Sequence, residues 1–149
     1  MRAVPQFGER RAGRTYADRP AAFGILERDE RIAVVRIAKP DGATWIDLPG
    51  GGVDPGETPE EGVVREYGEE AGLKVMVRES FALADQFFVN TDGEAWNNRS
   101  AFFVLDLVAP DAGLKVEEDH TLDWLSPPEA IASLRHDSHA WAVAAWMRR

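Results

Sequence analysis

Three glutamates crowd one short stretch of the chain, REYGEE at residues 65–70. A helix turns about 100° per residue, so Glu66, Glu69 and Glu70 share roughly one third of its circumference. Like charges at these spacings repel by on the order of 0.3 kcal/mol per pair, and the glycine at position 68 costs about 1 kcal/mol relative to alanine. Either this face is solvated, or a ligand offsets the cost. Three carboxylates on one face provide the hard oxygen ligands that Mg²⁺ and Mn²⁺ prefer.

Clear start and stop signals define the helix that carries these glutamates. Thr58 is a suitable N-cap, Pro59 suits the first turn, and Glu61 completes a capping box. Gly72 suits the position just beyond the last helical residue. The sequence therefore predicts a helix over residues 59–71. The glycines that precede it, in the loop at 49–52, would let the backbone come close to metals and phosphates.

The rest of the chain alternates between apolar runs and turn signals. Two helices are predicted near the C-terminus, and residues 91–100 are predicted to be a polar loop. Strands before and after a central helix, followed by helices, indicate an α/β fold, an α/β/α sandwich with a mixed β-sheet. Residues 1–20 are expected to form an N-terminal arm or edge segment and residues 21–149 a single domain. The predicted strands are 21–28, 31–37, 43–48, 73–80, 81–90, 101–108 and 120–125, and the two C-terminal helices are 126–134 and 138–148.

Composition narrows the class of protein. Of 149 residues, 44% are hydrophobic and 29% charged, which fits a soluble globular domain. No window has the roughly 18 apolar residues of a membrane helix, so no membrane partner is expected. The absence of cysteine excludes thiolate sites and fits a cytoplasmic location. The net charge of −9 argues against a nucleic-acid partner. Seven acidic residues and one basic residue fall within 51–73, so this segment holds most of that charge.

The segment from Gly51 to Leu73 resembles the Nudix box, GX5EX7REUXEEXGU. One position departs from the usual pattern: Tyr67 stands where Ile, Leu or Val is common, and it remains bulky and apolar. The chain is therefore identified as similar to the Nudix hydrolase superfamily, and to its small MutT-like, single-domain members, which implies the Nudix fold. The fixed letters that match are Gly51, Glu57, Arg65, Glu66, Glu69, Glu70 and Gly72.

The resemblance implies roles for particular residues. Glu66, Glu69 and Glu70 would bind Mg²⁺, or Mn²⁺, with the carbonyl of Gly50 adding a ligand. Catalytic roles are expected for four residues. Arg65 would pair with Glu57 and orient the glutamates, whereas a box glutamate such as Glu69 or a carboxylate from a later loop would act as general base. Glu118, in the acidic run 117–119, is the favoured candidate outside the box, and a charged surface loop is the alternative.

The implied reaction is attack of water on one phosphorus of a nucleoside diphosphate linked to another moiety. Markers of several specialised Nudix groups are absent, so a nucleoside triphosphate or a modified nucleotide is the expected substrate. Phe87, Phe88 and Trp96 could stack on its base or simply pack in the core. The arginines at 10, 11, 14 and 19 could cover phosphates or be solvated, and no histidine is expected to be catalytic.

Other functions and assemblies stay open at this point. One alternative is a Nudix-like module that binds a nucleotide for regulation without hydrolysing it. Another is an interaction domain whose acidic helix is only surface. A homodimer is also possible, since oligomers are common in this superfamily.

Overall fold

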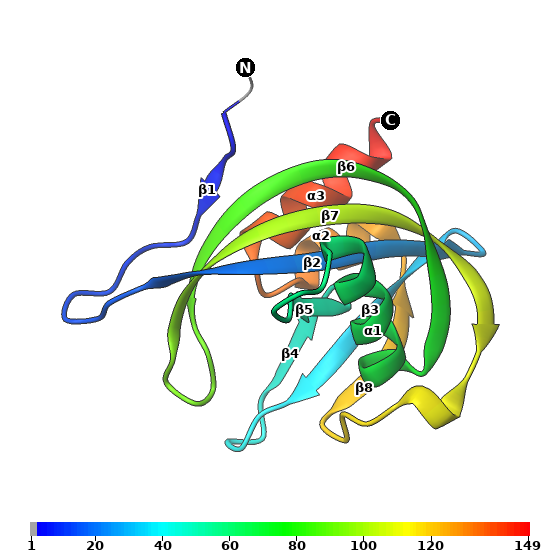
Figure 1. The fold of residues 1–149 in the computed structure, drawn as a ribbon, viewed down its shortest axis with the longest axis horizontal. Coiled ribbons are helices and arrows are strands. Elements are labelled where there is room, and N and C mark those ends of the chain that lie inside the picture. Colours follow the sequence, from blue (N-terminus) through cyan, green and yellow to red (C-terminus); the bar gives the residue numbers. More distant parts are fainter. Residues whose placement is uncertain (1–2) are drawn as a thin grey trace.

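The computed structural model describes residues 3–149 and places a long, curved sheet between helices (Figure 1). No helix in this range is both long and apolar enough to span a bilayer. The elements are β1 (Gln6–Phe7), β2 (Ala17–Arg28), β3 (Arg31–Ala38), β4 (Thr44–Asp47), β5 (Gly50–Gly52), α1 (Pro59–Ala71), β6 (Leu73–Val89), β7 (Ala95–Pro110), the 3-10 turn η1 (Ala112–Leu114), β8 (His120–Leu125), α2 (Pro127–Ser133) and α3 (Asp137–Met147).

The sheet is mixed, as predicted. Its strands follow the order β1-β6-β7-β2-β3-β4, with β5 paired to β2 and β8 paired to β3. β2 runs parallel to β7, and β1 runs parallel to β6. The remaining pairs are antiparallel.

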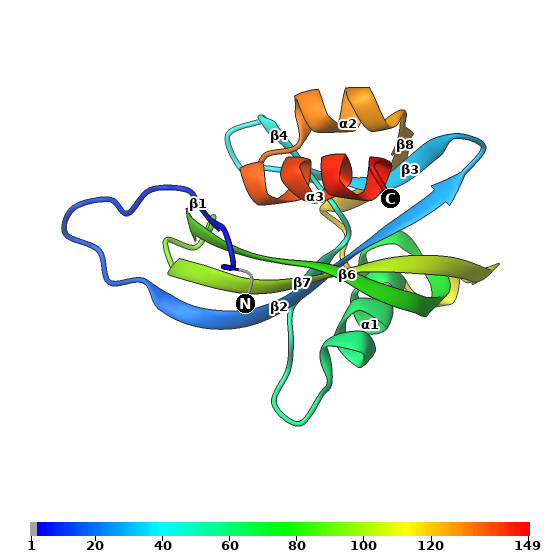
Figure 2. The same ribbon diagram turned by 90° about the horizontal axis from the view of Figure 1, so that it is seen from above.

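Period-two alternation along β2 supplies both faces of the core. Phe23 and Ile25 belong to the apolar cluster that includes Val143 of α3. Ala22 and Leu26 belong to the opposite cluster, which includes residues of α1. Successive strand residues point to opposite faces, so one strand can serve two layers. Figure 2 shows the result, with α2 and α3 on one side of the sheet and α1 on the other. The predicted α/β/α sandwich is confirmed.

Helix α1 has the predicted bounds, and its two unusual residues are explained by packing. Its start carries the capping box, and Gly72 ends it in the left-handed conformation, with φ of 66°. Tyr67 is fully buried, and its hydroxyl donates a 2.7 Å hydrogen bond to the carbonyl of Gly24. A Cβ on Gly68 would lie 3.3 Å from the Cβ of Leu114. The glycine therefore makes room for a neighbouring side chain.

The predicted polar loop at 91–100 is wrong for most of its length. β7 begins at Ala95, and Phe88 of β6 pairs with Trp96 across the strands. Asn97 and Asn98 are buried in β7 although both are polar. Their polarity made this stretch resemble a loop, but hydrogen-bonded partners inside the protein satisfy polar groups that a sequence pattern assigns to solvent.

The N-terminal segment is attached to the sheet. β1 pairs with β6 as the outermost strand of the sheet, and residues 8–16 then loop outward before β2 begins (Figure 1). The peptide N–H of Asp85 in β6 donates to the carbonyl of Pro5 over 2.9 Å. The arm therefore lies along the β6 edge.

Candidate active site

A cleft of about 620 Å³ lies where α1, the β4–β5 region, β6 and the segment before β8 come together. Its lining contains a set of carboxylates and a set of arginines with aromatic residues. The first set, called here the acidic cluster, is Glu66, Glu70, Glu117 and Asp119; the second, called the arginine–aromatic cluster, is Arg19, Arg135, Trp45 and Phe88.

Glu70 is the most buried carboxylate of the acidic cluster. Its Oε1 accepts a 2.9 Å hydrogen bond from the peptide N–H of Gly50, and its Oε2 lies 3.2 Å from His120 Nε2. Burial raises the pKa of Glu70 to about 7. Burial alone would lower the pKa of His120, but hydrogen bonds to Glu70 and Asp119 outweigh it and raise that pKa to about 9. A protonated His120 therefore donates to both carboxylates at neutral pH.

Arg65 holds the other box glutamates. Its Nε and Nη2 contact the two carboxylate oxygens of Glu57 at 2.8 and 3.0 Å. Its Nη1 donates to Glu66 Oε1 at 3.0 Å and to Glu69 Oε2 at 3.1 Å. The guanidinium lowers the pKa of Glu57, whereas burial raises the pKa of Glu66. One arginine thus contacts three carboxylates at once.

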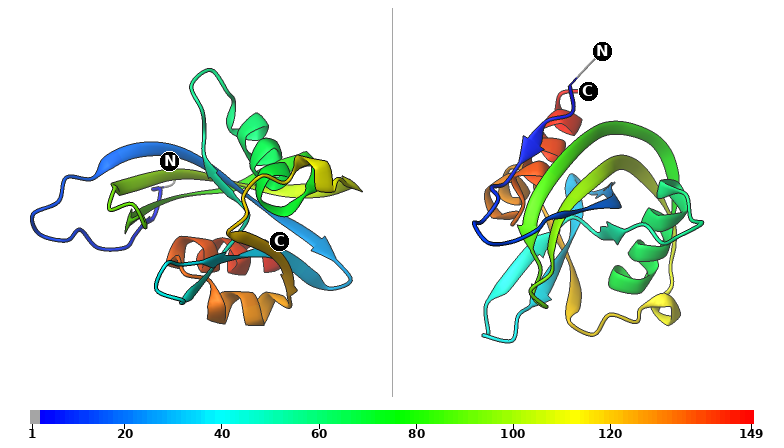
Figure 3. Two further views of the ribbon diagram at one scale, coloured as in Figure 1. Left: turned by 90° about the horizontal axis from the view of Figure 1, so that it is seen from below. Right: turned by 60° about the vertical axis from the view of Figure 1, so that its left-hand side comes forward.

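The main chain of α1 positions the second acidic segment. The carbonyl of Glu69 accepts hydrogen bonds from the peptide N–H groups of Val116 and Glu117, at 2.9 and 3.0 Å. The segment after η1 therefore runs beside α1 (Figure 3). Glu117 and Asp119 line the cleft as a result. Glu118 is exposed and is not among the lining residues that the structure describes.

The donor set fits a hard divalent cation. Ligand-type atoms of Glu117, Asp119 and His120 lie within 4.8 Å of one another. The protonated His120 ring donates to Glu70 and Asp119, so the carboxylates are the groups of this set that suit a cation. Burial raises the pKa of Glu66 and of Glu70 even though Arg65 contacts the first and His120 the second. Clustered carboxylate oxygens are the ligands of Mg²⁺, Mn²⁺ and Ca²⁺.

The backbone at Gly50 comes too close to the sheet for any side chain. Its φ is 146°, and a Cβ there would lie 2.2 Å from the carbonyl oxygen of Ala22. This close approach brings the Gly50 amide to Glu70 and orients that carboxylate. Glycine is required here by both φ and space.

The sequence-predicted aromatic residues divide between two places. Phe88 lines the cleft, whereas Trp96 is not among its described lining residues. The guanidinium of Arg19 lies 5.6 Å from the ring centroid of Phe88 and 5.4 Å from that of Trp96. Arg19 Nε donates to Asn98 Oδ1 at 2.8 Å. Trp96 therefore supports Arg19, and Arg19 faces the cleft from β2.

Arg135 was not anticipated from the sequence. Its Nη2 lies 2.6 Å from Asp47 Oδ2, and its guanidinium is 3.9 Å from the ring centroid of Trp45. His120 was also missed, because its contact with Glu70 joins residues that are far apart in the sequence. A local signal existed only for His120, which follows the acidic run 117–119.

Comparison with known families decides what kind of domain carries this cleft. The family model described as the NUDIX domain matches residues 17–147. The chain belongs to this family. A MutT-like protein of Streptomyces ambofaciens is 33% identical over 107 residues, covering 70% of this chain and 61% of that protein. An uncharacterised Nudix hydrolase of Rhodococcus erythropolis is 47% identical over 96 residues, covering 61% of this chain and 51% of that protein. The NUDIX chain thus spans between half and two thirds of the length of these two relatives.

A solved structure supports the same fold. A NUDIX hydrolase from Nitrosomonas europaea superposes with a TM-score of 0.72 at 19% sequence identity, covering 88% of this chain and 89% of that one. At this level of identity the likeness concerns the fold. The predicted Nudix fold is therefore confirmed.

Proposed function

We propose that this NUDIX domain hydrolyses a diphosphate linkage in a nucleoside diphosphate joined to another moiety. One observation carries the proposal: a single cleft combines box glutamates and loop carboxylates with arginines and an aromatic ring. Carboxylates suit a divalent cation, arginines suit phosphate oxygens, and an aromatic face suits a base. These are the three chemical parts that a metal-assisted nucleotide hydrolase needs.

The proposed cofactor is Mg²⁺, with Mn²⁺ as a substitute. Glu66, Glu69, Glu70 and the carbonyl of Gly50 would hold it. When bound, such an ion polarises phosphoryl oxygens and lowers the pKa of a coordinated water. Arg65 holds Glu66 and Glu69 through its Nη1 and is itself held by Glu57. Its proposed role is to position these carboxylates.

The proposed general base is a carboxylate of the acidic cluster. The attacking water loses a proton to the base while its oxygen bonds to phosphorus, and the bridging P–O bond breaks with its electron pair leaving on the released phosphate. Glu117 lines the cleft and Glu118 is exposed. We therefore favour Glu117 over Glu118 within this loop. Glu69 is the alternative from the box.

The proposed substrate follows from the residues of the arginine–aromatic cluster. No carboxylate of residues 3–149 lies within 4.0 Å of the Arg19 side-chain nitrogens, so its charge is available to a phosphate. Phe88 offers a ring beside it. A nucleoside triphosphate or a modified nucleotide is the simplest substrate that meets both groups.

The test is product release from a panel of nucleoside triphosphates, nucleotide sugars, ADP-ribose, dinucleoside polyphosphates and coenzyme A, with Mg²⁺ and with EDTA. Glu70→Gln should lower kcat/KM by about 100-fold, the upper range for losing one group of a metal site. The matched control is Glu60→Gln, which removes the same charge from an exposed position on the same helix. It should retain wild-type activity.

The outcomes separate hydrolysis from binding. Turnover lost with EDTA and with Glu70→Gln, but kept with Glu60→Gln, supports the hydrolase and identifies its substrate. Tight nucleotide binding without turnover of any compound would replace the proposal with the regulatory module. Turnover that persists in EDTA would exclude the metal site.

A further inference from the structure

A second cavity of about 460 Å³ lies beneath the N-terminal arm, and we call it the arm chamber. Four of its lining residues also line the cleft, so the two cavities share a wall. The shared residues are Trp45, Phe88, Arg135 and His136; the remaining lining of the chamber is Glu9, Arg10, Arg11 and Tyr16 from the arm and Gln86, Phe87 and Val89 from β6.

The arm is a built wall of this chamber. β1 pairs with β6 at one end, and Arg14 Nη1 donates a 3.0 Å hydrogen bond to the carbonyl of Gly93 at the other. Between them, the ring of Tyr16 meets the ring of Phe87 edge-on, with centroids 5.3 Å apart. At Gly8 the backbones are so close that a Cβ would lie 2.3 Å from the Phe87 carbonyl oxygen. The loop 8–16 is therefore held over the chamber.

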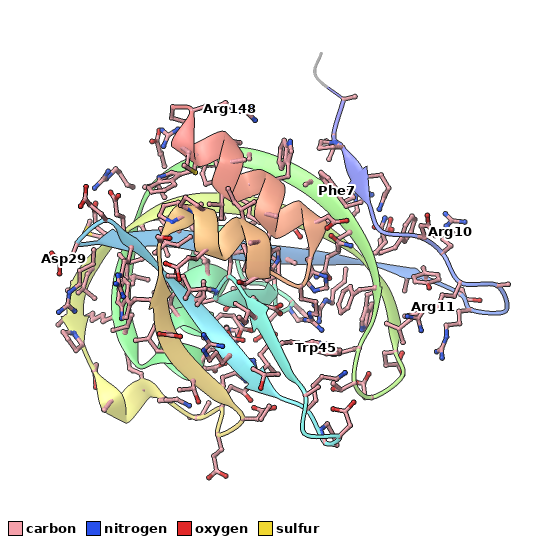
Figure 4. All side chains as sticks on the ribbon, turned by 180° about the vertical axis from the view of Figure 1, so that it is seen from behind. Phe7, Arg10, Arg11, Asp29, Trp45 and Arg148 are labelled. Atoms are coloured by element: carbon pink, nitrogen blue, oxygen red, sulfur yellow. The ribbon has the colours of Figure 1, made fainter. Side chains whose placement is uncertain are left out.

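The chamber concentrates positive charge in a protein whose net charge is −9. Arg10 and Arg11 both project from the arm (Figure 4). Within residues 3–149, no carboxylate oxygen lies within 4.0 Å of their side-chain nitrogens. The guanidinium of Arg10 lies 5.0 Å from the ring centroid of Phe87. Arginines without a counter-ion beside aromatic rings can bind phosphate and an aromatic base at once.

We infer that the arm chamber binds the second half of the substrate, and that this half is an aromatic base carrying phosphate. The inference rests on the proposed function and specifies the other moiety of the substrate. The cleft and the chamber each have the volume of a small-molecule site, roughly 300–1,000 Å³. A substrate with two nucleotide halves joined through phosphates would place one in each cavity and pass the shared wall at Phe88 and Arg135. The substrate class that fills both cavities is therefore the dinucleoside polyphosphates, whereas a nucleoside triphosphate fills the cleft alone.

The experiment compares a dinucleoside polyphosphate with a nucleoside triphosphate that contains one of its halves. The variant Arg10→Ala/Arg11→Ala removes the two exposed cations that the arm contributes to the chamber and keeps Arg135. It should lower kcat/KM for the dinucleotide by about tenfold, the effect of two exposed charged contacts, and leave the triphosphate unchanged. Arg10→Lys/Arg11→Lys should recover part of the loss, since it keeps the charge without the planar fork.

The matched control is Arg31→Ala/Arg148→Ala, which removes two exposed arginines that do not line either cavity. Arg148 follows α3, away from Arg10 and Arg11 in Figure 4. The control should hydrolyse both compounds at the wild-type rate. An equal loss on both compounds in the control and in the chamber variant would mean that general charge, and not the chamber, is responsible.

A binding measurement separates the failure of this inference from failure of the proposed function. By calorimetry in EDTA, the wild type should bind the dinucleotide about tenfold more tightly than the triphosphate, and the chamber variant should lose that preference. If neither compound is hydrolysed but the wild type prefers the dinucleotide, the binding role of the chamber is supported and the proposed hydrolase activity is not. If the triphosphate is hydrolysed and the dinucleotide shows no preference, the chamber inference is overturned.

Discussion

The two clusters of the cleft were built in different ways. The box part of the acidic cluster comes from one helix, so a fixed angle per residue sets which carboxylates converge. The arginine–aromatic cluster takes Arg19 from β2, Trp45 from β4, Phe88 from β6 and Arg135 from the segment between α2 and α3. Local sequence can specify the first arrangement, whereas the second exists only after distant strands have paired. The helical part of the proposed metal site is therefore encoded locally, whereas the proposed substrate recognition is assembled by the fold.

Substitutions that disturb the acidic cluster should lower activity more than substitutions in the arginine–aromatic cluster. Arg65, which contacts Glu66 of the acidic cluster, provides the most direct test. Arg65→Ala would leave Glu57, Glu66 and Glu69 without their shared cation. We expect kcat/KM to fall by about 100-fold on whichever substrate the panel identifies, the effect of losing support around a metal site. Steady-state kinetics with saturating Mg²⁺ measures this.

Arg65→Lys sharpens the same test. Lysine keeps the charge but cannot contact both oxygens of Glu57 with a planar fork. Its activity should fall between those of the wild type and Arg65→Ala. Wild-type activity in Arg65→Ala would show that the carboxylates do not need positioning.

The core behind the arginine–aromatic cluster makes stability depend on pH. Burial lowers the pKa of His136 and of His139 to about 3. The unfolded chain binds these protons near pH 6.5, so the contribution of these two histidines to the unfolding free energy falls as pH drops below that value. We expect a loss of about 1–2 kcal/mol per histidine between pH 8 and pH 5.5. The raised pKa values of His120 and Glu70 act in the opposite sense over the same range, because the folded chain binds those protons more tightly than the unfolded chain. Chemical denaturation of the wild type and of a histidine variant across this range therefore isolates the contribution of the buried histidine.

His139→Asn isolates one of the two histidines. The Nδ1 of His139 accepts a 3.2 Å hydrogen bond from the peptide N–H of Leu48, and asparagine offers an acceptor in a similar place. The variant should be less stable at pH 8 because it fills less of the core. Between pH 8 and pH 5.5 its free energy of unfolding should lose about 1–2 kcal/mol less than that of the wild type. An unchanged slope would mean that His139 takes up a proton without unfolding.

A substitution in the arginine–aromatic cluster should have the smallest effect on activity. Arg19 is held by Asn98 and lies beside two rings, so Arg19→Ala removes one cation from the cleft without touching the acidic cluster. We expect about a tenfold rise in KM and little change in kcat, as for one charge-assisted contact to substrate. The control Arg31→Ala should change neither constant. A loss of kcat with KM unchanged would place Arg19 at the transition state and remove the contrast between the clusters.

The features of the fold that depend on neighbouring residues could be predicted from the sequence. The capping residues of α1, its glutamate face and its final glycine were all readable, because they depend on neighbours within a few positions. The loop between residues 90 and 95 was predicted too long. The buried asparagines of β7 have partners far away in the chain, such as Gln6 and Arg19, and no local pattern contains them.

The sequence by itself determined the fold class, the acidic helix and the family, since a 3.6-residue period and a fixed spacing suffice for these. Only the tertiary structure decided that Glu117 faces the cleft while Glu118 is exposed, and that His120 reaches Glu70. The physical reason is the distance along the sequence between the contacting residues. The contact of Arg19 with Asn98 spans 79 positions, and that of Arg135 with Asp47 spans 88. Such pairs are set by strand register and helix packing, which form only when the whole chain folds.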